Sequence, residues 1–414
     1  MAVFRAFQAL RPQPSMAEKI AALPYDVVSR KEAEKIGEEN PYSFLHVDRA
    51  EIDLGMETDL YAPEVYEKAR ENLIKMEEQG LLKMDESPCY YIYELTRKNK
   101  TQTGIVGCAS IDDYQEGIIK KHELTREEKE KDRIRHVDTC DANTGPIYLT
   151  CRYTETLNTV IKKWKETQEA VYDFTAEDGV IHRVWVICEE EVLQKIQKEF
   201  SGISSLYIAD GHHRAASAVK VGLKRREENP GYTGEEEFNY FLSVVFPHEE
   251  LTILPYNRVV KDLNGLGERA FLGSLKFNFE VMLMPGFPCK PVEKHCMGMY
   301  LVGEWYHLKA WEDVYAGKDV VGQLDVSILQ ERVLSPVLGI KDPRTDDRIR
   351  FVGGIRKMTE LQEMVDETGG VAFVMYPTSM EDLMQIADEG RLMPPKSTWF
   401  EPKLRSGLFI HKLS

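Results

Sequence analysis

The stretch from Leu206 to Arg214, which reads Leu-Tyr-Ile-Ala-Asp-Gly-His-His-Arg, constrains the fold more than any other part of the chain. The apolar residues before Asp210 predict a short buried strand, and the alanine-rich run after Arg214 predicts a helix. Gly211 stands between them and permits a tight turn, because it has no Cβ. We therefore expect an acid, two imidazoles and a guanidinium around the first turn of a helix, where backbone N–H groups attract anions.

The polar side chains of this turn allow two interpretations. Asp210 could be a helix cap whose neighbours are merely solvated. Capping does not explain two adjacent histidines and an arginine in the same few residues. A binding or catalytic site is therefore the better interpretation.

Composition and charge exclude several classes of protein. The chain has 414 residues, enough for about two or three domains with cores of their own. Its formal net charge of −16 argues against nonspecific DNA binding. No stretch approaches the roughly 20 apolar residues that span a bilayer, and the first residues lack the apolar run of a signal peptide.

Cysteine and histidine spacing predicts no metal site. The seven cysteines are scattered and none forms a Cys-x-x-Cys pair, which favours reduced thiols and a cytoplasmic location. The His-x₃-His spacing is absent as well. The adjacent His212 and His213 cannot both face one ion without backbone distortion.

The pattern of apolar residues predicts an α/β (α+β) fold in three parts. Residues 1–85 should contain a helix capped by Ser29 and Glu32. Residues 86–260 alternate strands and helices, with a helix that starts in a capping box at Thr125 and a central strand over 238–246. Residues 261–414 read as an α+β module without a chemical motif of its own.

The motif at 206–214 is similar to a known signature. A strand, then Gly211-x-x-Arg214, then an alanine-rich helix resembles the phosphate-binding signature of the ParB/sulfiredoxin superfamily. The Asp-Gly-His-His-Arg run at 210–214 is especially similar to that of the superfamily's free-serine kinases. The whole chain, from the segment at 24–27 to that at 393–398, resembles the "domain of unknown function 1015" family. These resemblances imply a ParB/sulfiredoxin-like core at 86–260 with α+β additions on both sides.

The resemblance also implies roles for individual residues. In the free-serine kinases, a glutamate upstream of the Asp-Gly-His-His-Arg run is the general base for the substrate hydroxyl, and Glu123 matches it in order and context. The alternative is a solvated glutamate in a charged segment. On the kinase interpretation the catalytic residues are Glu123, Asp210 and His212, phosphate binds to Gly211, His213 and Arg214, and Asp210 holds Mg²⁺ together with the nucleotide phosphates.

Further candidates lie elsewhere in the chain. Lys129 and Arg133 share one face of the helix after Glu123 and could bind phosphate, although the acids around them favour a solvated charged face. Weaker candidates for substrate binding are His122, Tyr25, Asp26, Lys396 and Ser397. A rigid turn is the alternative for the segments at 25–26 and 396–397.

These resemblances imply a nucleotide-dependent phosphotransferase that uses ATP or ADP and Mg²⁺, with a small hydroxyl metabolite as acceptor and free serine as the suggested one. The alternative is a nucleotide-binding or nucleotide-hydrolysing regulatory protein of the ParB type, without kinase activity. A simple hydrolase also stays open, because water and a hydroxyl need similar activation. Sulfiredoxin-like chemistry is excluded, because His212 stands where the cysteine would be. We expect substrate and nucleotide as partners, and no nucleic acid or membrane.

Overall fold

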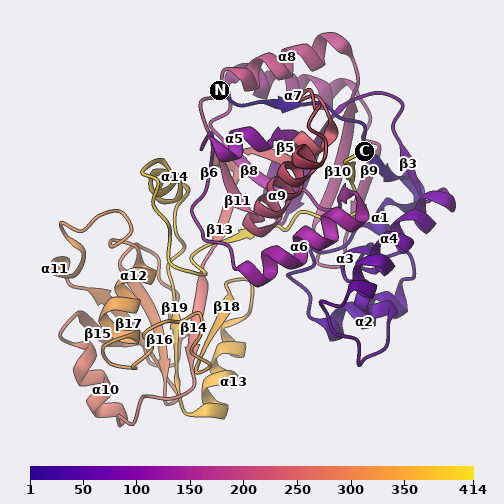
Figure 1. Ribbon diagram of the computed structural model, residues 1–414. Helices are drawn as coiled ribbons and strands as arrows, with labels where there is room; N and C mark the ends of the chain where they lie inside the picture. The colour runs from indigo at the N-terminus through magenta and orange to yellow at the C-terminus, as the bar shows by residue number, and fades with distance from the viewer. The chain divides into compact units, whose positions relative to one another are not determined.

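The computed structural model describes residues 1–414, which its internal contacts divide into two compact units (Figure 1). The first unit comprises Met1–Lys121, Thr125–Leu251 and Pro402–Ser414. The second comprises Thr252–Glu401 and the short segment His122–Leu124. These bounds differ from the division at 85 and 260 that the sequence predicts. Residues 1–85 share a unit with the residues after them, and the end of the chain returns to the first unit.

A mixed nine-stranded sheet is the framework of the first unit. Its order is β6-β11-β8-β12-β5-β4-β10-β9, with β1 paired to β5. The strand β12 lies in the middle and is almost entirely buried, as its apolar sequence predicts. The strands are β1 (Phe4–Arg5), β4 (Tyr90–Arg97), β5 (Lys100–Ser110), β6 (Ile119–Lys120), β8 (Ile147–Cys151), β9 (Tyr172–Thr175), β10 (Ile181–Ile187), β11 (Leu206–Asp210) and β12 (Tyr240–Pro247).

The helices of the first unit begin largely where the sequence predicts. Ser29 and Glu32 form the expected capping box of α2. The expected capping box at Thr125 is wrong. The helix α6 begins at Glu127 without a side-chain cap, because the Thr125 hydroxyl donates to the Glu130 carboxylate at 2.7 Å instead. The helices are α1 (Ala17–Ile20), α2 (Arg30–Glu39), α3 (Leu45–Asp48), α4 (Pro63–Glu78), α5 (Ile111–Gln115), α6 (Glu127–Cys140), α7 (Glu155–Thr167), α8 (Glu190–Ser201) and α9 (His212–Glu228).

The apolar cluster of the N-terminal residues also includes side chains from later in the chain. Apolar side chains of α3 and α4 pack with Cys140 at the end of α6, with Ala142 just after it, and with Ile410 near the end of the chain. Leu10 and Ile410 exchange two backbone hydrogen bonds of 3.0 Å, and β21 (His411–Lys412) pairs with β7 (Ala142–Asn143). These contacts join residues 1–85 to the rest of the first unit.

The second unit contains an antiparallel six-stranded sheet in the order β15-β17-β16-β19-β14-β18. These strands are β14 (Tyr256–Val260), β15 (Phe279–Leu283), β16 (Cys296–Leu301), β17 (Glu304–Ala310), β18 (Ile349–Gly353) and β19 (Val371–Val374). Its helices are α10 (Glu268–Leu275), α11 (Glu312–Tyr315), α12 (Asp325–Leu329), α13 (Met358–Thr368) and α14 (Met380–Asp388). The unit therefore has an α+β composition, with bounds that differ from the predicted 261–414. No helix in either unit has the length and apolar character needed to cross a bilayer.

Two cysteines of the first unit form a disulfide, contrary to the expectation that all the thiols are reduced. Cys89 and Cys188 are bonded, with their Cα atoms 4.7 Å apart, and the five other cysteines are free. The cause is strand pairing. Tyr90 of β4 faces Ile187 of β10, so the residues just beyond this pair stand opposite each other. A separation of 99 residues hides this proximity in the sequence.

Candidate functional site

The loop that carries Glu123 and the turn at Gly211 leave the sheet at the same edge. The strands β6 and β11 are parallel neighbours, with Ile119 opposite Leu206 and Lys120 opposite Tyr207. Parallel strands in matching register send their chains out of the sheet side by side. Two segments that lie about 90 residues apart in the sequence therefore leave the sheet side by side, at the C-terminal ends of β6 and β11.

Gly211 makes the turn into α9, as expected. Its φ of +92° lies in the left-handed region that favours glycine. A Cβ there would come within 3.2 Å of the Arg214 guanidinium, so the glycine also leaves room for that side chain to fold back over the turn. Asp210 is the last residue of β11, and Gly211 occupies the cap position. The interpretation of Asp210 as a helix cap is therefore wrong.

The loop after β6 is fixed to the start of α9 by a hydrogen bond. The backbone N–H of Arg126 donates to Nε2 of His213 at 3.0 Å. Because Glu123 precedes Arg126 by only three residues, the chain keeps it within about 11 Å of that contact. Helix α6 then continues against α9, where the Ser217 hydroxyl donates to the Glu130 carbonyl at 3.1 Å (Figure 1). His213 therefore anchors the loop through one ring nitrogen.

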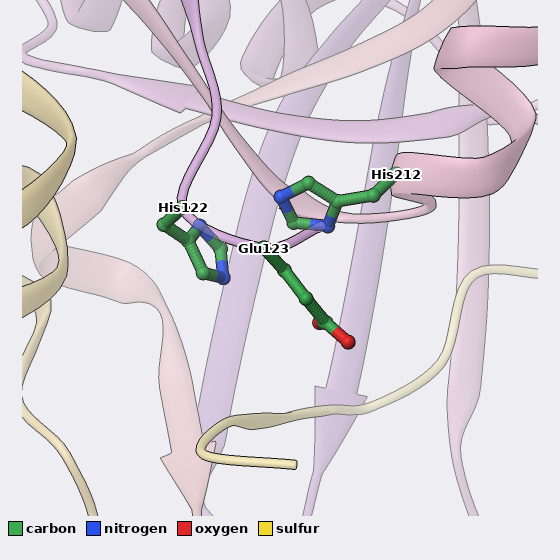
Figure 2. Close-up of side chains that lie close together, drawn as sticks. All are labelled: His122, Glu123 and His212. Carbon is green, nitrogen blue, oxygen red and sulfur yellow. The ribbon is translucent and has the colours of Figure 1, made fainter. Parts of the chain in front are cut away.

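Figure 2 shows three side chains close together at this edge, namely His122, Glu123 and His212. One potential ligand atom from each lies within 4.8 Å of those from the other two. The two histidines are 2% and 6% exposed, so both imidazoles are held inside the protein. Sequence spacing gave no sign of this cluster, because its members come from two different strand ends.

Asp210 is surrounded by positive charge. Its Oδ2 lies 3.2 Å from Nζ of Lys403 and 3.9 Å from Nη2 of Arg214. Burial alone would raise the pKa of Asp210, but Lys403 and Arg214 outweigh burial and lower the pKa to about 2. The carboxyl is therefore ionised at neutral pH. Lys403 was not among the residues that the sequence indicated, because nothing local marks a partner 193 residues away.

The Arg214 guanidinium is held by the loop before β8. Its Nη1 donates to the Pro146 carbonyl at 2.6 Å. A Cβ on Gly145 would come 3.4 Å from the same nitrogen and 2.9 Å from the hydroxyl of Ser406, so a larger residue there would have to displace the serine side chain. Arg214 is therefore a preorganised positive charge rather than a mobile surface residue.

Two hollows of the first unit share Tyr25, Asp48, Arg133 and His136 as lining residues. Arg214 lines the smaller hollow. Lys129 and Asp26 line the larger one, which has a volume of about 300 Å³. The structure thus brings together four candidates from distant parts of the sequence. They are Tyr25, Asp26, Lys129 and Arg133.

Arg133 is a buried, fixed charge at the boundary of the two hollows. Its guanidinium carbon lies 4.0 Å from the centre of the Tyr25 ring, and its Nε lies 2.8 Å from a carboxylate oxygen of Asp132. Burial would lower the pKa of Arg133, but Asp132 and Tyr25 outweigh burial and raise it. Burial, followed by the charge of Arg133, lowers the pKa of His136. Arg133, rather than His136, therefore carries the positive charge among the residues that line both hollows.

Lys396 and Ser397 belong to the second unit and show the contacts of a rigid turn. Lys396 has a φ of +57°, and its carbonyl accepts a hydrogen bond of 3.0 Å from Arg258. The Ser397 hydroxyl donates to the Pro394 carbonyl at 2.6 Å. These contacts favour the structural alternative for this segment.

Comparison with known proteins identifies the family. The chain belongs to the family described as "Protein of unknown function (DUF1015)", whose model matches residues 4–327. The family resemblance inferred from the sequence is thereby confirmed over these residues. None of the curated proteins matches the sequence significantly.

Several solved structures are similar over most of their length. A free serine kinase variant in complex with AMP is 14% identical with a TM-score of 0.38, over 74% of this chain and 92% of that chain. A conserved hypothetical protein from Pyrococcus furiosus is 14% identical with a TM-score of 0.36, over 76% and 96%. C-terminally truncated SbnI from Staphylococcus aureus is 12% identical with a TM-score of 0.37, over 73% and 85%. Similarity at these scores is distant, so the site is interpreted from this chain's own residues.

Proposed function

We propose that this protein binds the phosphates of ATP or ADP at the start of α9 and transfers a phosphoryl group to a small hydroxyl metabolite. The observation that carries the proposal is the parallel pairing of β6 and β11. It brings a carboxylate, Glu123, to the same strand edge as the helix N-terminus that would hold the phosphoryl donor. A general base can act in phosphoryl transfer only if the hydroxyl that it activates reaches the phosphoryl group, so the two sites must lie close together.

The phosphate site would combine a helix N-terminus with fixed cations. The first N–H groups of α9 have no partners within the helix and point toward the turn. Arg214 adds a guanidinium that Pro146 already holds in place. Arg133 and Lys129 add two cations to the lining of the adjoining hollow, which also contains the carboxylates of Asp26, Asp48, Glu51 and Asp132. Phosphoryl transfer needs mainly positioning and neutralisation of charge, and this arrangement offers both.

Two carboxylates would act as the general base and as the Mg²⁺ ligand. Glu123 would accept the proton of the acceptor hydroxyl as it attacks the phosphoryl group. Asp210 would hold Mg²⁺ bound to the nucleotide phosphates. Lys403 and Arg214 both approach Oδ2 of Asp210, so Oδ1 is the oxygen that would reach the ion.

The acceptor follows from the resemblance to free-serine kinases. Free serine, or a similar amino acid with a hydroxyl group, is the substrate that we propose to test first. A cytoplasmic location would suit such an acceptor.

The direct test is a metabolite screen. Purified protein with Mg²⁺ and ATP or ADP is incubated with pooled amino acids and sugars, and mass spectrometry detects any new phosphorylated compound. Lys129→Ala should lower product formation. Lys131→Ala is the matched control, because Lys131 is an exposed lysine of the same helix that does not line the hollow and pairs with Glu127. Nucleotide loss without a phosphorylated acceptor would indicate a hydrolase and would contradict the proposal.

A further inference from the structure

The cluster of His122, Glu123 and His212 has the composition of a metal site. It offers two imidazoles and one carboxylate, with ligand atoms within 4.8 Å of one another (Figure 2). We propose that these three side chains bind one divalent transition-metal ion of the Zn²⁺ type. This inference goes beyond the proposed phosphoryl transfer, because such an ion would bind in the absence of nucleotide.

The ligand types decide which ions fit. Imidazole nitrogen suits zinc and its transition-metal neighbours, whereas Mg²⁺ selects oxygen ligands and keeps most of its water. Two of the three ligands here are imidazoles. The cluster is therefore distinct in chemistry from the Mg²⁺ position proposed at Asp210.

The geometry requires only local movement. Zinc binds nitrogen and oxygen at about 2.1 Å, which places two ligands of a tetrahedral site roughly 3.4 Å apart. Contraction from 4.8 Å to that distance is within reach of side-chain rotations. Neighbouring residues of a strand point to opposite faces, but His122 and Glu123 lie in a loop outside any strand or helix, so both can turn toward one point.

The burial of the ligands favours a defined site over chance binding at the surface. Both histidines are buried, and the third ligand is half-buried. His212 is the first residue of α9, and the hydrogen bond from Arg126 to His213 holds the loop beside it. Three protein ligands leave a fourth position of a tetrahedral ion open for water or a substrate oxygen.

The test is a titration of metal-free protein with Zn²⁺ alone, followed by calorimetry and by elemental analysis after dialysis. We expect about one bound zinc per chain. His122→Ala and His212→Ala should each weaken binding by more than about 100-fold, since even outer partners of metal ligands contribute 10–100-fold. His248→Ala removes a histidine outside the cluster and should leave binding unchanged. Mg²⁺ at the same concentration should not compete.

X-ray absorption at the zinc edge of the loaded wild-type protein provides a readout that does not depend on how the variants fold. It should show two imidazole ligands and oxygen. Sulfur ligands, fewer than two imidazoles, or undiminished zinc binding by folded His122→Ala and His212→Ala variants would each overturn the proposal. Because no nucleotide is present, failure here is separate from failure of the phosphotransferase proposal.

Discussion

The ammonium group of Lys403 lies 3.2 Å from the carboxylate of Asp210, although 193 residues separate them. Lys403 belongs to the segment Pro402–Ser414, which returns to the first unit after the second unit is complete. The same segment places Arg405 2.6 Å from Asp178. The end of the chain therefore contributes directly to the charge balance of the candidate site.

Lys403→Met should raise the pKa of Asp210 from its value of about 2. A carboxyl whose pKa is lowered on folding adds stability above its unfolded pKa of about 3.8, and that stability is lost as pH falls through about 2. The variant should therefore be less stable than wild type at pH 7, and the difference should shrink toward pH 2. Chemical unfolding at a series of pH values measures this. Lys131→Met removes an exposed lysine as the control, and an equal loss at every pH would contradict the linkage.

Arg214→Ala should weaken ATP or ADP binding by roughly 10–100-fold, because a hydrogen bond to a charged group contributes about 1.5–3 kcal/mol. Arg214→Lys should recover only part of the affinity, since lysine keeps the charge but not the planar fork. Calorimetric titration measures both. Lys224→Ala, near the other end of α9, is the control. Unchanged affinity in Arg214→Ala would move the phosphate site elsewhere.

Local patterns were sufficient to predict much of the fold near the site. The strand β11, the left-handed Gly211 and the helix α9 follow from apolar residues, a glycine and a helix-forming run within about 20 positions. The Ser29 cap was equally readable. The capping box predicted at Thr125 does not form. The threonine hydroxyl accepts no backbone N–H of the helix and donates to the Glu130 carboxylate, a contact that sequence spacing does not reveal.

Contacts that depend on strand pairing could not be predicted. The approach of His122 to His212 follows from the register of β6 on β11, and the Cys89–Cys188 bond follows from that of β4 on β10. Side-chain periodicity indicates which face of a strand is buried, but not which strand lies beside it. Nothing near Lys403 in the sequence indicated its acid partner.

The stability of the second unit should depend on pH because of Asp325. Burial raises the pKa of this carboxyl to about 7, although the backbone N–H of His295 donates to it at 2.9 Å. The folded state therefore keeps a proton that the unfolded chain releases above its pKa of 3.8. Stability should fall with rising pH between these two values, by up to about 1.4 kcal/mol per pH unit, and level off above pH 7.

Asp325→Asn should remove this pH dependence, because the amide still accepts the His295 N–H but does not ionise. Hydrogen exchange of peptides from α12, in the full chain at pH values from 4 to 8 and corrected for intrinsic rates, measures the local stability. Asp366→Asn changes an exposed acid of the same unit and should keep the wild-type profile. A wild-type profile that is flat over this range would show that Asp325 is ionised in the folded protein.

Glu123→Gln tests the role of the carboxylate at the shared strand edge. Glutamine keeps the size and shape of the side chain but cannot accept the proton of an attacking hydroxyl. Turnover of the acceptor found in the screen should therefore fall by roughly 10²–10⁴-fold, while ATP or ADP affinity stays within a factor of about two. Steady-state kinetics and calorimetry separate the two effects. Glu128→Gln, an exposed glutamate on the following helix, should retain full turnover. If Glu123→Gln turns over at the wild-type rate while Arg214→Ala loses nucleotide binding, the phosphate site stands and the base must be another residue.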